Sequence, residues 1–356
     1  AYADIVRKRS ILRQLISATS DINDTVFNQQ GQSSEQILEF AEQTVFEIAE
    51  QEDRGRKSYQ NVSAYTDVVM ERIQALAESK SPITGIRTGY NDLDFKTAGF
   101  QRSDLIIVAG RPSMGKTALA VNIAETAAIK DKHSVAIFSM EMQAEQLTMR
   151  MMSSLANIDQ HKVRTGKLDG DDWIRFTSTV GILQKTKMFI DDTPALTPAE
   201  LRARCRRISR EHGLDLVVVD YLQLMQVAGT SENRATEISE ISRSLKAMAK
   251  ELNIPVIALS QLNRSLESRQ DKRPVMSDLR ESGAIEQDAD VIIFIYRDEV
   301  YDEESSDKGM AEIIISKQRN GPIGKIKLAF RGQYTRFDNF VEDPLIYDSP
   351  SVGKYE

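Results

Sequence analysis

LIIVAGRPSMGKT, residues 105–117, is the stretch that decides the fold. Its first five residues are apolar and predict a strand buried on both faces. The next eight match the phosphate-binding pattern G-x-x-x-x-G-K-[ST] in full, and residues 117–129 continue with a helical pattern. A chance glycine-rich turn is the alternative, and the flanking strand and helix argue against it. We therefore predict a P-loop that binds a nucleoside triphosphate.

The chemistry of this loop follows from its backbone and two side chains. Successive N–H groups and the N-terminus of the helix are expected to surround the phosphates. Lys116 neutralises the β- and γ-phosphate oxygens, and the Thr117 hydroxyl binds Mg²⁺. The predicted cofactors are ATP and Mg²⁺, and the predicted nucleotide-binding residues are Gly110, Ser113, Met114, Gly115, Lys116 and Thr117.

From about residue 84 onward, strand-like runs alternate with helical patterns. This alternation predicts an α/β fold with a mostly parallel central sheet. The last two strands are separated by a Gly-Pro turn at residues 320–324 and are expected to form an appended hairpin. The predicted strands are 105–109, 135–139, 216–219, 256–260, 291–296, 313–316 and 326–330.

Polar side chains follow three of these strands, at the edge of the sheet where ligands bind in open α/β folds. Asp220 ends the run 216–219 and is predicted to complete the metal site with Thr117. Glu141, just after strand 135–139, is placed to take a proton from the attacking water. Gln261, just after strand 256–260, is placed to hydrogen-bond the γ-phosphate. For Glu141 and Gln261, a helix-capping or solvent-facing role is the alternative.

The chain divides into four predicted regions. Residues 1–51 form a helical hairpin, the remnant of an N-terminal domain, and residues 52–83 form a linker. The linker contains an amphipathic helix at about 62–77, whose apolar stripe docks either on its own motor domain or on a neighbouring subunit. Residues 84–345 are the α/β domain that carries the P-loop, and 346–356 are a C-terminal tail.

Composition excludes several classes of protein. The single cysteine, Cys205, rules out an internal disulfide and a thiolate zinc cluster, and indicates a reducing, cytoplasmic compartment. No apolar run is long enough to span a membrane, so no membrane partner is expected. The net charge of −7 argues against a broad basic surface, although DNA held in a narrow, locally basic channel remains compatible with it.

Six ordered segments resemble the DnaB family of bacterial replicative helicases, whose motor is a RecA-like ATPase. They are 111–117 (RPSMGKT), 138–142 (FSMEM), 220–225 (DYLQLM), 258–264 (ALSQLNR), 278–283 (DLRESG) and 316–322 (SKQRNGP). The resemblance covers nearly the whole chain, including the hairpin and the linker helix. It implies a homo-hexameric ring that tracks 5′ to 3′ along single-stranded DNA and unwinds the duplex at the replication fork.

The resemblance also assigns roles to matching residues. It implies that Asp220 binds the metal with Thr117, that Glu141 is the catalytic base, and that Gln261 senses the γ-phosphate. Lys317 and Arg319 are implied to enter the neighbouring subunit's nucleotide site, with Arg319 as the arginine finger. Residues two apart on a strand point to the same side, so these two can reach together. Without the resemblance, an exposed basic hairpin would be the preferred interpretation.

A DNA-binding loop is the remaining match. Arg280, Glu281 and Gly283 correspond to a family loop that binds the phosphates of the strand, and no aromatic residue lies between Arg273 and Asp290 to stack on bases. A plain surface turn is the alternative. By contrast, the five arginines between 202 and 210 spread around a helix, and we interpret them as a solvated helix.

The resemblance further implies that the chain lacks most of the family's N-terminal domain, which recruits primase. Primase and a helicase loader are therefore expected partners of the full-length protein, in the cytoplasm at the nucleoid and replisome. Three other functions are weighed against the helicase. They are a RecA-type recombinase, an ATP-gated DNA clamp that does not translocate, and a small-molecule P-loop kinase. The recombinase does not need the long helical segment before the motor, and Glu141 and Arg319 argue against a clamp.

Overall fold

The computed structural model describes residues 2–28, 61–78, 82–227, 234–279 and 283–341, together with six single positions between 34 and 45. The chain forms two compact units, residues 1–80 and 81–356. Most of the second helix of the predicted hairpin, and the predicted tail at 346–356, lie outside the described residues.

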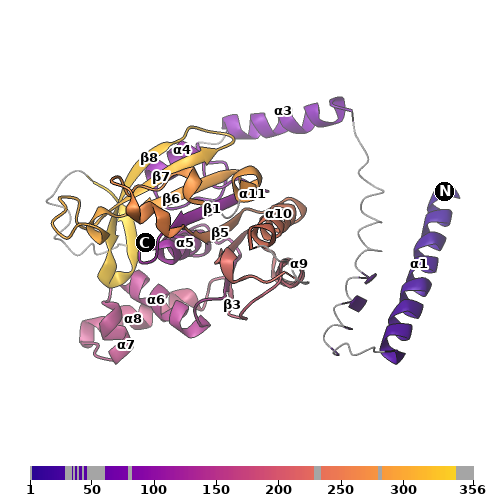
Figure 1. Ribbon diagram of the computed structural model, residues 1–356, viewed down its shortest axis with the longest axis horizontal. Helices are drawn as coiled ribbons and strands as arrows, with labels where there is room; N and C mark the ends of the chain where they lie inside the picture. Colours follow the sequence, from indigo (N-terminus) through magenta and orange to yellow (C-terminus); the bar gives the residue numbers. More distant parts are fainter. Residues whose placement is uncertain are drawn as a thin grey trace. The chain divides into compact units, whose positions relative to one another are not determined.

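The described part of the first unit includes two long helices, α1 (Tyr2–Phe27) and α3 (Ser63–Glu78) (Figure 1). Helix α3 confirms the helix expected in the linker. Its apolar stripe includes Tyr65, Val69 and Ile73, all of which are more than half exposed. The surface on which this stripe docks stays a prediction.

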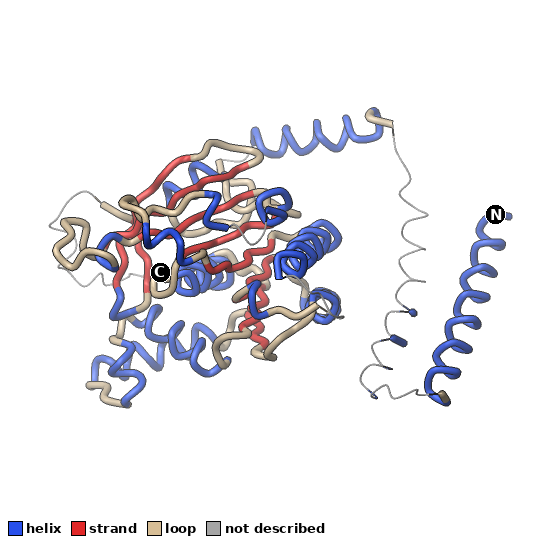
Figure 2. Tube along the Cα trace, in the orientation of Figure 1, coloured by secondary structure: helices blue, strands red, loops and turns tan. Residues whose placement is uncertain are grey.

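The second unit is built on one nine-stranded sheet, and it confirms the predicted α/β class (Figure 2). The strands are β1 (Leu105–Gly110), β2 (Val135–Ser139), β3 (Met188–Asp191), β4 (Leu216–Asp220), β5 (Val256–Gln261), β6 (Val291–Tyr296), β7 (Met310–Gln318), β8 (Gly324–Arg331) and β9 (Arg336–Asn339). Their order in the sheet is β3-β2-β4-β5-β1-β6-β7-β8-β9. The strands from β3 to β6 in this order are parallel, and the last four are joined by antiparallel pairs.

The first five strands predicted from apolar runs correspond to β1, β2, β4, β5 and β6, and all five are buried along their length apart from the last residue of β5. Strands β3 and β9 were not predicted. Both are four-residue strands at the edges of the sheet, and both are only partly buried over most of their length. Short edge strands carry neither the continuous apolar run nor the regular alternation on which strand prediction depends.

Helices cover both faces of the sheet because alternate strand residues point to opposite sides. The helices are α4 (Asn91–Thr97), α5 (Lys116–Glu125), α6 (Ala144–Ala156), α7 (Gln160–Thr165), α8 (Gly170–Leu183), α9 (Pro198–His212), α10 (Arg234–Leu252) and α11 (Gly283–Asp288). Side chains such as Ile106 and Val108 pack with α4 and α5 in one core. Side chains such as Leu105 and Ile107 pack with α9, α10 and α11 in the other. None of the helices in the described ranges is long and apolar enough to cross a membrane.

The helix predicted after the P-loop does reach residue 129, although α5 ends at Glu125 and the chain continues as a π-helical segment, Thr126–Lys130. The prediction of a solvated helix at 202–210 holds only in part. Arg207 and Arg210 of α9 are exposed, but the other three arginines make ion pairs with other elements. Arg202 and Arg206 both pair with Glu251 of α10, and Arg204 pairs with Asp191 of β3. Spacing along one helix cannot reveal these carboxylates, because they come from distant segments.

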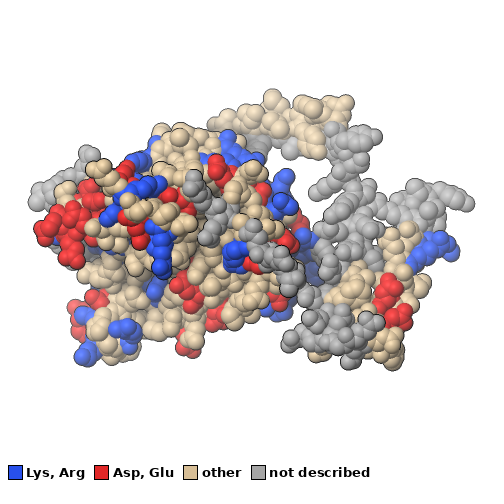
Figure 3. All heavy atoms as spheres, viewed as in Figure 1, with Lys and Arg blue, Asp and Glu red and all other residues tan. Residues whose placement is uncertain are grey.

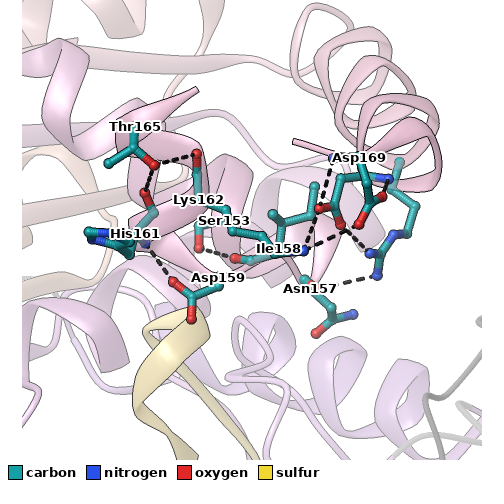
Figure 4. A network of polar contacts seen from close by, with 10 residues as sticks. Ser153, Asn157, Ile158, Asp159, His161, Lys162, Thr165 and Asp169 are labelled. Carbon is teal, nitrogen blue, oxygen red and sulfur yellow. Dashed lines mark hydrogen bonds and ion pairs between the residues drawn. The ribbon is translucent and has the colours of Figure 1, made fainter. Parts of the chain in front are cut away.

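Helices α6, α7 and α8 form a helical arm beside the sheet (Figure 1). Figure 4 shows the polar network that fixes it: Asp159 accepts a hydrogen bond from the backbone N–H of His161, and Lys162 contacts Asp169. Lys162 also pairs at 2.8 Å with Asp172, which is almost fully buried. These contacts join α7 to the start of α8.

Candidate active site

The P-loop connects β1 to α5, and its backbone adopts a conformation that requires glycine at position 115. Gly115 has a φ of +96°, and a Cβ atom there would lie 2.9 Å from the ring of Phe337. Both facts make glycine the residue that fits. Lys116 donates from Nζ to the Arg111 carbonyl at 3.2 Å, and burial lowers the pKa of its ammonium group. A partly buried ammonium group that no carboxylate of the described ranges contacts is suited to bind an anion such as a phosphate.

Thr117 and Asp220 lie side by side next to this lysine. The Thr117 hydroxyl donates to Asp220 Oδ2 at 2.8 Å, and Asp220 is only 3% exposed. Burial raises the pKa of the Asp220 carboxyl to about 6, and the neighbouring Glu141 charge adds to this effect. A hydroxyl and a carboxylate oxygen are hard donors that suit Mg²⁺, which takes its remaining ligands from phosphates and water. The residues present therefore fit a metal bound with a triphosphate.

The sheet register brings the predicted polar residues to one edge. Ser139, which ends β2, pairs with Asp220, and Gly110 pairs with Gln261. Glu141 lies two residues beyond β2, where it is exposed and close enough to raise the pKa values of both Asp220 and Lys116. The edge predicted from strand ends is therefore the edge on which these groups meet.

The two residues expected to act across a subunit interface lie together, and both contact the C-terminal end of α11. Lys317 Nζ donates to the carbonyls of Glu286 and Ala289, and Arg319 donates to the Gln287 carbonyl at 2.7 Å. The Arg319 guanidinium is also 3.4 Å from Asp290. Lys317 and Arg319 point to the same side, as their two-residue spacing predicts. Their contacts with α11 of their own subunit were not predicted from the sequence.

The predicted DNA loop lies only partly within the described residues. Arg280 and Glu281 lie outside the described residues. Gly283 is the first residue of α11, and a Cβ atom there would meet no heavy atom within 4 Å. Since Lys317 and Arg319 hold the other end of α11, this short helix connects the loop to the basic pair.

Comparison with known proteins gives one consistent result. Residues 85–339 match the family described as the DnaB-like helicase C-terminal domain. The chain is 56% identical over 353 residues to the replicative DNA helicase DnaB of Pasteurella multocida, covering 98% of this chain and 76% of that protein. It is 50% identical to the replicative DNA helicase DnaC of Bacillus subtilis, covering 95% and 74% respectively. The chain belongs to the DnaB family of replicative helicases.

Two solved structures agree with this membership. One, described as an ATPase domain, superimposes with a TM-score of 0.76 at 38% identity, covering 80% of this chain and all of that one. A DnaB-like replicative helicase, described together with its interactions with primase, superimposes with a TM-score of 0.81 at 34% identity, covering 95% and 77%. The RecA-like fold and the class of ATP-driven DNA helicase follow for this chain.

Two cations of this DnaB-family motor lie at the site and were missed in the sequence. Arg150 on α6 is close enough to Asp220 to lower the pKa of that carboxyl, and its buried Nε has no hydrogen-bond partner among the described residues. Arg297, just after β6, donates to the carbonyl of Ser113 in the P-loop and stacks on Phe330. Neither residue belongs to a phosphate-binding motif. Arg150 could have been suspected from its place in the sequence, because it lies nine residues after Glu141 on the helix that follows.

A buried carboxyl group lies at the far end of α5. Glu125 is 5% exposed, and its Oε2 accepts hydrogen bonds from Asn122 and Ser154. Its Oε1 has no partner within the described ranges. Burial raises the pKa of this carboxyl to about 8, against the smaller opposing effect of Arg336. At neutral pH the group is therefore mostly protonated in the folded protein.

Glu125→Gln is expected to stabilise the protein more at pH 8 than at pH 5. The folded chain retains a proton between pH 4.5 and about 8 that the unfolded chain releases, so wild-type stability falls as pH rises through this window. Glutamine cannot ionise, and its gain over wild type should reach about 3 kcal/mol at pH 8. Urea unfolding at both pH values measures it, with Glu303→Gln on an exposed turn as the control. An equal gain at pH 5 and pH 8 would contradict the assignment.

Proposed function

We propose that this helicase motor hydrolyses Mg-ATP as a hexameric ring and uses the energy to move 5′ to 3′ along single-stranded DNA. The observation that carries the ATPase part is the Thr117–Asp220 pair beside the partly buried Lys116. A hydroxyl and an ammonium group from the P-loop, together with a carboxylate from the end of β4, are the parts that Mg-nucleoside triphosphate binding needs.

The residues divide the chemistry as follows. The N–H groups of the P-loop and Lys116 hold the phosphates. Mg²⁺, bound by Thr117 and Asp220, would neutralise charge on the phosphate oxygens. Glu141 accepts the proton of the attacking water, because it is exposed beside the site and free to approach the nucleotide. Gln261 donates a hydrogen bond to the γ-phosphate, and Arg150 adds a positive charge on the same side.

Lys317 and Arg319 are proposed to complete the site of the neighbouring subunit. Both are about half-exposed or less in the isolated chain and contact only carbonyls and Asp290 of their own subunit in the described ranges. Such contacts are weak enough to exchange for a triphosphate, since guanidinium groups bind phosphates with stronger, charge-assisted hydrogen bonds. Hydrolysis would then depend on assembly of the ring.

DNA is proposed to contact Arg280, Glu281 and Gly283 through its phosphates. Figure 3 shows acidic and basic side chains interspersed over the visible face of the motor, in keeping with the net charge of −7. DNA binding therefore needs a local site, and a loop that contacts only the backbone suits a motor that ignores sequence. Primase and a loader are proposed partners of the full-length protein; a primase interaction is described for the related helicase structure.

Unwinding of a forked duplex tests this function against a recombinase and a clamp. With ATP and Mg²⁺, the protein should separate a fork that carries a 5′ single-stranded tail and leave a fork with only a 3′ tail intact. Native mass spectrometry of the same sample with nucleotide should give six copies. DNA binding without strand separation would support the clamp, and strand exchange between homologous duplexes without fork unwinding would support the recombinase.

A further inference from the structure

Gln223 makes an arrangement of hydrogen bonds that no catalytic motif requires. It lies in the short 3-10 turn Leu222–Leu224, directly after the strand that ends at Asp220. Its side-chain Nε2 donates to the Gln261 carbonyl at 3.3 Å and to Ser260 Oγ at 3.0 Å. Its Oε1 accepts from the Gln261 backbone N–H at 3.2 Å. One side-chain amide therefore binds both backbone polar groups of Gln261.

These contacts occur where the sheet itself stops supplying them. Pairing between β4 and β5 ends at Val219 and Ala258, before either strand reaches Asp220 or Gln261. The Gln223 amide acts as one more rung of the ladder, because its N–H and C=O bond a strand as a neighbouring backbone would. Its own backbone is fixed as well, since Arg234 donates to the Gln223 carbonyl.

The other side of Gln261 is held by the P-loop. Gln261 pairs with Gly110 in the sheet register, and the Leu262 N–H donates to the Gly110 carbonyl at 3.3 Å. Arg111, which is buried, donates to the Leu262 carbonyl at 2.8 Å. The backbone at Gln261 is therefore fixed between the phosphate-binding loop and the segment that follows the metal-binding carboxylate.

We propose that Gln223 is a positioning residue that sets the Gln261 side chain against the γ-phosphate. This inference rests on the proposed function, in which Gln261 is the γ-phosphate contact. The hydrogen bonds between the Gln223 side chain and the Gln261 backbone join neutral groups. They lie at the edge of a cavity of about 410 Å³ that is lined by residues including Tyr221, Gln223 and Gln261. Loss of it would leave the fold intact and free the Gln261 backbone to shift, and displacements of about 1 Å can reduce turnover by up to a hundredfold.

The test is a double-mutant cycle of Gln223→Ala and Gln261→Ala, measured as DNA-stimulated ATP hydrolysis by the full chain. Gln223→Ala should lower kcat at least tenfold and change the KM for Mg-ATP less than threefold, because the phosphate-binding residues are untouched. The double variant should turn over no more slowly than Gln261→Ala alone, since residues that act through one another are not additive. Gln226→Ala, an exposed glutamine three residues later, is the matched control and should keep the wild-type rate.

Gln223→Glu provides a second measurement should the alanine variant fold poorly. At neutral pH the introduced carboxyl group is ionised, so it keeps the acceptor for the Gln261 N–H and loses the donor. Gln223→Glu should therefore also lower kcat at least tenfold. A rate within twofold of wild type for Gln223→Ala or Gln223→Glu, or rate losses that multiply in the double variant, would overturn the inference. A wild-type rate for Gln261→Ala would instead remove the γ-phosphate role from the proposed function itself.

Discussion

Arg319→Ala is expected to lower kcat for ATP hydrolysis about a thousandfold and to leave nucleotide binding within twofold of wild type. An arginine supplied from a neighbour stabilises charge that develops on the transferring phosphoryl group, and its contribution is of this order. The fold should survive, because Asp290 keeps its hydrogen bonds from Lys246 and from the Leu105 backbone. Steady-state ATPase assays and equilibrium binding of a fluorescent ATP analogue measure the two effects.

Mixed rings decide whether the arginine acts in trans. Arg319→Ala and Lys116→Ala subunits are each inactive by expectation, yet a mixture contains interfaces that pair an intact P-loop with an intact arginine. Activity in the mixture should therefore exceed that of either variant alone. Lys327→Ala, an exposed basic residue on the same hairpin, controls for the loss of one positive charge. Mixtures without any gain, or a fully active monomer carrying Arg319→Ala, would refute a site shared between subunits.

Glu141→Gln is expected to reduce kcat between about a hundredfold and ten-thousandfold while ATP still binds. Glutamine keeps the shape of the side chain and cannot accept a proton, so the general-base contribution is lost. Binding should be equal or tighter, because one negative charge is removed from the neighbourhood of the phosphate site. Single-turnover hydrolysis separates the chemical step from product release.

The control for this variant lies one turn away. Glu145→Gln removes an exposed carboxylate from the first turn of α6 and should leave turnover within about twofold of wild type. If Glu141→Gln also retained wild-type turnover, another group would have to accept the proton, and Glu141 would revert to a solvent-facing residue. An ATP-bound but inactive variant should also remain on DNA, which distinguishes failed hydrolysis from failed assembly.

The sequence alone was sufficient where the determinants are contiguous. The P-loop draws Lys116, Thr117 and the N–H groups proposed to bind phosphate from eight successive residues, so one pattern specifies the whole arrangement. The central strands were predicted because burial on both faces demands unbroken apolar runs. Since parallel strands end at one edge, the positions of Asp220, Glu141 and Gln261 after their strands also indicated that they would meet.

Tertiary structure decided which side chains pair with which. Arg150 reaches the neighbourhood of Asp220, the α9 arginines bind carboxylates on β3 and α10, and Gln223 binds the backbone of Gln261 across a strand boundary. Lys317 and Arg319 were placed on one side by their spacing, while their partners at the end of α11 depended on how β7 packs beside that helix. Periodicity and motifs in the sequence predict a helix or strand and the face that it buries. The partner of a hydrogen bond depends instead on the distance between atoms that are far apart in the chain. Only the folded arrangement of the sheet and its helices fixes that distance.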